Sequence, residues 1–172
     1  TSNSTNKTYI GGLADTIYGN VELDNITVTG QIITGCYAGS LAGFAIEFGT
    51  ATIKNCTNKA DITVVVPPNK DTWSCIGGLA AQFDYTSVTF INCRNEGKLS
   101  ADHSKMTSPG SYYMGHMIAK GNYKNSPHDL IIENCSFSEG ATITGWDKTE
   151  GDYHTYPFEG KIAGTEEYSY GS

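Results

Sequence analysis

Short runs of alternating apolar and polar residues recur along this chain, and the runs repeat as a set. Each set contains a small-residue string, found at Gly11–Ala14, Gly39–Ala42, Gly77–Ala80, Gly115–Ile118 and Gly160–Ala163. The third residues of these strings are Leu13, Leu41, Leu79, Met117 and Ile162, separated by 28, 38, 38 and 45 positions. Because a repeated unit buries its apolar face by stacking on copies of itself, the pattern predicts a solenoid.

Two more apolar positions recur after each string. They are Leu23, Ile53, Phe90 and Ile132, followed by Ile32, Ile62, Leu99 and Ile143. A small residue lies between the two positions where the chain must bend, and the 3.6-residue period of an amphipathic helix is missing. Each unit therefore predicts three short strands, the first being Ile10 to Ala14 and its equivalents. The predicted fold is an all-β, right-handed parallel β-helix of about four to five rungs, with loops on the edges.

The repeat boundaries divide the chain into units at about 9–37, 38–75, 76–113 and 114–157, with a partial unit at 158–164. We expect residues 1–172 to form one β-solenoid domain. Since Thr1 is not an initiator methionine, we also expect that this domain was excised from a larger surface protein with flanking domains.

Asparagine and cysteine recur together at the bend after the second predicted strand. The asparagines are Asn25, Asn55, Asn92 and Asn134, and the residues after them are Ile26, Cys56, Cys93 and Cys135. Stacked amides can hydrogen-bond from rung to rung, so we expect a structural, inward-facing amide ladder that leaves the glycosylation sequons in this column unused. The three cysteines exchange with isoleucine, which predicts small, buried, free thiols.

Charge and composition exclude several classes of function. The formal net charge is −7 and Arg94 is the one arginine, which argues against nucleic acid as a partner. The sequence contains no run of about 20 apolar residues, the length that a membrane span requires, so we expect none. We expect no metal and no cofactor, because the cysteines lack zinc-site spacing and the histidines form no metallopeptidase pattern. The histidines, expected to be solvated, are His103, His116, His128 and His154.

Three insertions follow the third predicted strand and should emerge on one edge of the solenoid. They span 65–74, 102–112 and 146–157 and are rich in aromatic residues. Flat rings beside carboxylates can stack on sugars and bind their hydroxyls, although the same rings can simply pack together. The candidate ligand-binding residues are Trp73, Tyr112, Trp146, Asp147, Tyr153 and Tyr156. A further aromatic column, Tyr9, Tyr37, Cys75, Tyr113 and Phe158, is expected to serve packing.

The repeated unit resembles the GLUG-type repeats of bacterial cell-surface and adhesin-like proteins. The segments closest to that pattern are Ser40–Gly43, Gly77–Ala80 and Phe90–Leu99. The resemblance spans roughly residues 9–164 and departs from the family in the Gly115–Ile118 copy and the aromatic insertions. It implies a parallel β-helix that is secreted or displayed on a bacterial surface and has no catalytic residues.

Three classes of function fit these observations. The first is a non-catalytic adhesion module whose edge loops recognise a glycan or a host surface protein. The second is a passive spacer of a large secreted protein. The third is a β-helix polysaccharide lyase or glycoside hydrolase, for which Asp147, Glu150 and Asp152 are the available carboxylates.

Overall fold

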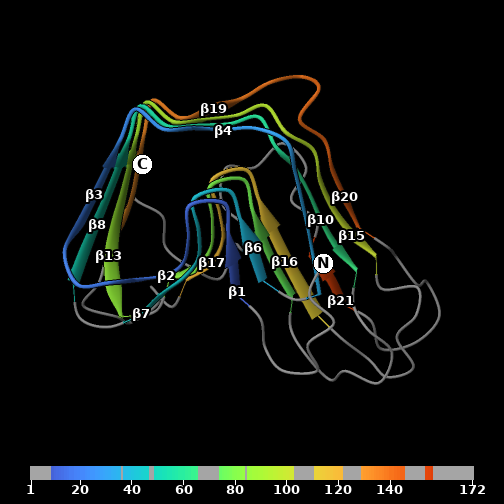
Figure 1. Ribbon diagram of the computed structural model, residues 1–172, viewed down its shortest axis with the longest axis horizontal. Helices are drawn as coiled ribbons and strands as arrows, with labels where there is room; N and C mark the ends of the chain where they lie inside the picture. The colour runs from blue at the N-terminus through green and yellow to red at the C-terminus, as the bar shows by residue number, and fades with distance from the viewer. Residues whose placement is uncertain are drawn as a thin grey trace.

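Parallel strands and tight bends make up the described part of the chain, in which no helix occurs. The computed structural model describes residues 9–35, 37–46, 49–65, 74–83, 85–102, 111–121, 129–145 and 154–156. Five strands follow one another in each rung, and every strand pairs in parallel with its equivalents in the neighbouring rungs. The result is the all-β parallel β-helix that the repeat predicts (Figure 1).

The five sheets are named A to E in the order in which strands β1 to β5 of the first rung belong to them. Sheet A contains β1 (Tyr9–Gly11), β6 (Tyr37–Gly39), β11 (Ser74–Gly77), β16 (Ser111–Gly115) and β21 (His154–Tyr156). Sheet B contains β2 (Ala14–Tyr18), β7 (Ala42–Ile46), β12 (Ala80–Phe83) and β17 (Ile118–Gly121). Sheet C contains β3 (Val21–Asp24), β8 (Gly49–Lys54), β13 (Thr86–Ile91) and β18 (Leu130–Glu133). Sheet D contains β4 (Thr27–Val28), β9 (Thr57–Asn58), β14 (Arg94–Asn95) and β19 (Ser136–Phe137). Sheet E contains β5 (Gln31–Thr34), β10 (Asp61–Val65), β15 (Leu99–Asp102) and β20 (Ile143–Gly145).

The strand register matches the predicted columns of apolar residues. Ile53 pairs with Leu23 on one side and Phe90 on the other, and Phe90 pairs in turn with Ile132. In sheet E the paired residues are Ile32, Ile62, Leu99 and Ile143. Like residues therefore stack on like, because strands that lie parallel and in register repeat about every 4.8 Å.

The rung has five strands where the sequence predicted three. The first predicted strand is divided by a tight turn at the small-residue string, so that the string ends a strand of sheet A and leads into sheet B. A Cβ atom added to Gly77 would lie 1.6 Å from the Ala80 carbonyl oxygen, which shows how closely the turn folds back. The second added strand is the two-residue element of sheet D, which is too short to show an alternating pattern.

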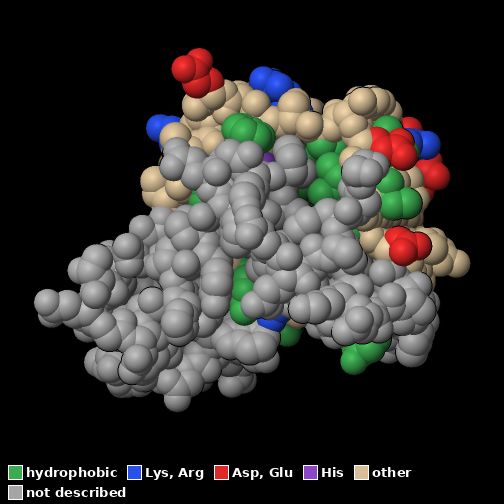
Figure 2. Space-filling view, turned by 180° about the vertical axis from the view of Figure 1, so that it is seen from behind, with side chains coloured by type: hydrophobic (Ala, Val, Ile, Leu, Met, Phe, Trp, Pro, Cys, Tyr) green, Lys and Arg blue, Asp and Glu red, His purple; other side chains and the backbone are tan. Residues whose placement is uncertain are grey.

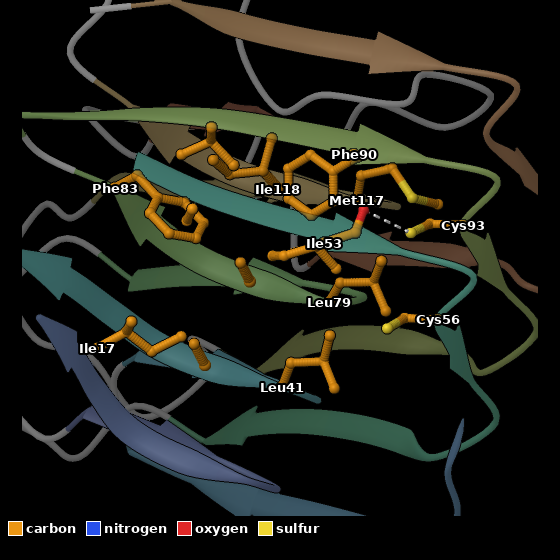
Figure 3. Close-up of a cluster of buried hydrophobic side chains, with 14 of the residues drawn as sticks. Ile17, Leu41, Ile53, Cys56, Leu79, Phe83, Phe90, Cys93, Met117 and Ile118 are labelled. Atoms are coloured by element: carbon orange, nitrogen blue, oxygen red, sulfur yellow. Dashed lines mark hydrogen bonds between the residues drawn. The ribbon is translucent and has the colours of Figure 1, made fainter. Parts of the chain in front are cut away.

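Sheet A lies between sheets B and E and separates the interior into compartments (Figure 1). One apolar cluster fills the space between sheets B and C, and a second fills the space between sheets A and E. Figure 3 shows the larger cluster, in which Leu41, Leu79 and Met117 stack from rung to rung. A smaller cluster of Tyr37, Cys75, Ala81 and Ala119 packs the other face of sheet A onto sheet B.

The predicted aromatic column has a different residue in the fifth rung from the one expected. Tyr9, Tyr37, Cys75 and Tyr113 pair as expected. Tyr113 then pairs with Tyr156, so Phe158 does not occupy the next position in the column. The insertion before β21 is thus shorter than the alignment of the glycine strings indicated. The last of these strings lies outside the described residues.

Candidate functional site

The three predicted insertions leave and re-enter the solenoid at the same edge. Each begins where a strand of sheet E ends, at Val65, Asp102 or Gly145, and each returns to the start of a strand in sheet A. Since β10, β15 and β20 are neighbours in sheet E, and β11, β16 and β21 are neighbours in sheet A, the points of departure and return are stacked. The fold therefore attaches the three segments to one edge, one rung apart.

The strands that receive these segments belong to sheet A, whose described central residues are buried on both faces. Ala38, Ile76 and Met114 on one face of sheet A pack against sheet E and are fully buried. On the opposite face, Tyr37 and Cys75 pack against sheet B and are buried as well. A sheet that is buried on both faces is a rigid support, so it holds the ends of the attached segments in fixed positions.

Most of the predicted ligand-binding residues lie outside the described residues. These are Trp73, Trp146, Asp147 and Tyr153. The backbones of Tyr112 and Tyr156 lie in adjacent strands of sheet A, where Tyr112 pairs with Thr155 and Tyr156 with Tyr113. The structure thus brings Tyr112 and Tyr156 to neighbouring positions at the edge where the insertions attach.

The predicted asparagine column occupies a left-handed bend. Asn25, Asn55, Asn92 and Asn134 have φ angles of 56°, 54°, 52° and 50°, a conformation that asparagine tolerates better than most residues. Asn92 Nδ2 donates to Asn55 Oδ1 over 3.3 Å, and Asn55 Nδ2 donates to Asp24 Oδ1 over 2.9 Å. The expectation that these amides face inward is wrong, because all four residues are exposed and their hydrogen bonds run along the outside.

The cysteine column points into the interior beside this bend. Cys56, Cys93 and Cys135 are free thiols, and their Sγ atoms donate to the carbonyls two residues earlier, at Lys54, Ile91 and Glu133. Cys93 Sγ also lies 3.3 Å from the Ile53 carbonyl oxygen of the preceding rung (Figure 3). Cysteine at this position thus adds a weak hydrogen bond to carbonyl groups that also accept from a backbone N–H of the preceding rung.

Hydrogen bonding between the stacked thiols shifts their three pKa values in opposite directions. The bond from Cys93 lowers the pKa of Cys56 to about 7 and also lowers the pKa of Cys135. The same bonds to Cys135 and Cys56, together with burial, raise the pKa of the central Cys93 thiol. The thiols of Cys56 and Cys135 therefore lose a proton more readily than the thiol of Cys93.

A buried ladder of polar side chains, which the sequence did not predict, runs from rung to rung along sheet D and ends at His116. Asn58 Nδ2 donates to Asn95 Oδ1 over 2.8 Å, and Asn95 Nδ2 lies 2.9 Å from His116 Nδ1. An amide nitrogen only donates, so His116 Nδ1 accepts and the neutral ring carries its proton on Nε2. The two amides also close their own bends through bonds to Ala60 and Gly97. The repeated Asn-Cys-x-Asn segments at 55–58 and 92–95 contain the signal for this ladder.

His116 ends the ladder where the repeat changes. Phe137 occupies the position of Asn58 and Asn95 in the fourth rung and offers no acceptor to Asn95. The His116 ring stacks on Phe137 with a centroid distance of 3.9 Å and supplies the missing acceptor. The expectation of a solvated histidine is wrong here, since His116 is 1% exposed and burial lowers its pKa to about 4.

No cluster of three or more histidine, cysteine, aspartate or glutamate side chains among the described residues could hold a metal ion. The described part of the chain likewise has no helix of the length and hydropathy that spanning a bilayer requires.

Comparison with known proteins returned no relative: no family model, no curated protein and no solved structure matches the chain. The resemblance to GLUG-type repeats therefore stays a prediction that rests on the motifs quoted above.

Proposed function

We propose that this chain is a non-catalytic recognition module of a bacterial surface protein. In this proposal the stacked rungs serve as the scaffold, and the insertions at 65–74, 102–112 and 146–157 bind a glycan or a host surface protein. The ligand-binding residues would be Trp73, Tyr112, Trp146, Asp147, Tyr153 and Tyr156. No cofactor is required.

One observation carries the proposal. Three insertions that each contain at least one tryptophan or tyrosine are attached to the same pair of stacked sheets, at the same edge and one rung apart. Segments that interrupt a repeat cost nothing in core packing when they lie outside it, which is why binding residues so often occur on loops supported by a rigid scaffold. Repetition of aromatic residues at one edge is the arrangement that an extended ligand such as an oligosaccharide would use.

The buried sheet A supports this assignment further. Tyr112 and Tyr156 belong to strands of that sheet, where Tyr112 pairs with Ser74 and Thr155 and Tyr156 pairs with Tyr113, so strand pairing sets their backbone positions. A ligand that bridges two segments then meets anchor points whose spacing does not change, which lowers the entropy lost on binding.

The proposal is tested on an array of immobilised bacterial, plant and mammalian glycans. The wild-type chain should bind a restricted set of glycans, and Trp73→Ala and Trp146→Ala should each reduce that signal at unchanged melting temperature. Tyr18→Ala is the matched control, because Tyr18 is a 60% exposed aromatic residue in sheet B, which none of the insertions joins. Equal loss of binding in Tyr18→Ala would contradict the proposed site.

A passive spacer is the second candidate, and the continuous stacking of the rungs favours it. The apolar clusters extend through successive rungs, so the length of the molecule is set by rung number alone. The spacer function would be preferred if the array gave no signal and a panel of host surface proteins gave none, while Trp73→Ala and Trp146→Ala melted like the wild type.

A further inference from the structure

The tight turn between sheets A and B, which lie side by side in Figure 1, sets side chains of the two sheets opposite one another. In the fourth rung the facing residues are Tyr113 and Lys120, and Lys120 Nζ lies 4.7 Å from the centre of the Tyr113 ring. In the third rung they are Cys75 and Gln82, and Cys75 Sγ lies 3.9 Å from Gln82 Oε1. Cys75 pairs with Tyr113 and Gln82 pairs with Lys120, so the two facing pairs occupy equivalent positions of adjacent rungs. The turn of the third rung therefore sets a thiol against a side-chain amide.

Cys75 is a departure from an aromatic column. It pairs with Tyr37 on one side and Tyr113 on the other, and the column continues to Tyr9 and Tyr156. The rings of Tyr9 and Tyr37 pack together, with centroids 4.8 Å apart. The third rung thus has a smaller, nucleophilic residue where its neighbours have tyrosine, at the level where sheet B presents a carboxamide.

The two facing groups lie in an enclosed part of the molecule. Cys75 is a fully buried free thiol, Ala81 and Ala119 of the same cluster are fully buried too, and Gln82 is half-buried. In Figure 2 most charged side chains of the described residues lie at the outer surface, whereas Lys120, the neighbour of Gln82, is only 8% exposed. An enclosed site excludes water, which protects a reactive acyl group from hydrolysis.

The reaction open to these two groups is acyl transfer from nitrogen to sulfur. The Cys75 sulfur attacks Cδ of Gln82, the S–Cδ bond forms as the Cδ–Nε2 bond breaks, and the thiol proton leaves with the amide nitrogen as ammonia. Oxidation states do not change, so no oxidant or reductant is needed. Fixed proximity favours such a step, because well-oriented groups of one molecule reach effective concentrations of about 10⁵–10⁸ M.

We propose that Cys75 and Gln82 form an internal thioester, which joins sheet A to sheet B across the turn at Gly77–Ala80. The thioester is an acyl donor, and the former amide carbon of the half-buried Gln82 is the atom that a small primary amine attacks. This attack forms a new amide at Gln82 and restores the Cys75 thiol. The site uses no residue of the insertions, so it is independent of the recognition function proposed above.

Intact-mass spectrometry of the full chain tests the thioester. The wild-type mass should fall below the sequence mass by one ammonia, and fragment spectra should place the loss within residues 75–82. Thiol titration of the denatured, phosphine-reduced chain at acidic pH should detect four of the five cysteines. Treatment with methylamine should then add the mass of one methylamine and restore the fifth thiol.

Variants assign the two partners. Cys75→Ala and Gln82→Glu should both have their full sequence masses, and the half-buried Gln82→Glu keeps the test valid if Cys75→Ala does not fold. Cys93→Ala is the matched control, since it removes another buried thiol and should retain the loss of ammonia. A wild-type chain with its full sequence mass and five titratable thiols would overturn the proposal. So would a loss of ammonia that persists in Cys75→Ala, or a link from Gln82 to Lys120 that leaves all five thiols free.

Discussion

Replacement of Asn95 by leucine tests the buried amide ladder directly. Asn95 accepts from Asn58 Nδ2 and donates to the Gly97 carbonyl and to His116 Nδ1, at distances of 2.8, 3.0 and 2.9 Å. Asn95→Leu keeps a side chain of similar size but leaves these three partner groups without Asn95. All three lie in the buried interior, so water cannot replace the lost bonds.

The expected loss of stability follows from the count of unsatisfied groups. Each buried polar group that loses its partner costs about 1–3 kcal/mol. The buried apolar surface of leucine offsets about 1–2 kcal/mol of that cost. With three groups at the middle of that range, Asn95→Leu should lower the free energy of unfolding by about 4 kcal/mol. This is a large part of the ~5–15 kcal/mol typical of a folded domain.

Chemical denaturation followed by far-ultraviolet circular dichroism measures this loss. The matched control is Asn92→Gly, in the same rung, which removes one exposed hydrogen bond of 3.3 Å and retains a residue suited to the left-handed bend. That control should cost less than about 1 kcal/mol. If Asn95→Leu cost no more than Asn92→Gly, the ladder would not be the buried, mutually dependent network described here.

Three further outcomes follow from the same structure. His116 has a pKa of about 4, below the ordinary 6.5, so the unfolded chain takes up the proton first and stability falls as pH drops from about 6.5 toward 4, by about 3 kcal/mol in total. Urea midpoints between pH 7 and 5 should decline in the wild type and stay flatter in His116→Gln, and parallel curves would contradict this account. Mass spectrometry after brief iodoacetamide treatment at neutral pH should find Cys135, half-buried and with a lowered pKa, alkylated before Cys93, whereas faster labelling of Cys93 would refute the assigned thiol order. Gly77→Ala should prevent folding or lower the melting temperature severely because its Cβ would overlap the Ala80 carbonyl, while Gly140→Ala, with open space around it, should melt like the wild type.

The columns of the solenoid were predictable because the apolar residues carry their own register. Ile53, Phe90 and Ile132 fall at the same point of successive units, and stacking them is the way for each unit to bury its apolar face. The parallel pairing follows from the same repetition. The number of strands in each rung was harder to predict. The turn between sheets A and B and the two-residue strands of sheet D leave no periodic signal in the sequence.

Polar residues misled the prediction where their burial depends on the third dimension. Asn58 and Asn95 follow a bend and have the composition of a loop, yet the fold encloses them. His116 became buried because Phe137, more than twenty positions later, provides the ring on which it stacks. Conversely, the asparagines at the bend after sheet C face outward, because the left-handed conformation turns their side chains away from the core.

The candidate site shows the same division between repeated and interrupting residues. The repeated strings fix where the insertions attach, so the common edge was predictable from the drift in repeat length. The exposure of Leu13 was not predictable, because Leu13 is the same residue as Leu41 and Leu79 at the same point of the repeat. It differs from them in having no described rung beyond it.

Nuclear Overhauser contacts in the uniformly labelled protein test the parallel, in-register stacking on which every proposal above depends. Contacts should link Leu23 to Ile53, Ile53 to Phe90 and Phe90 to Ile132, with the backbone pattern of parallel strands in each case. Contacts confined to single repeat units, or the close pairs of α protons that mark antiparallel strands, would contradict the solenoid.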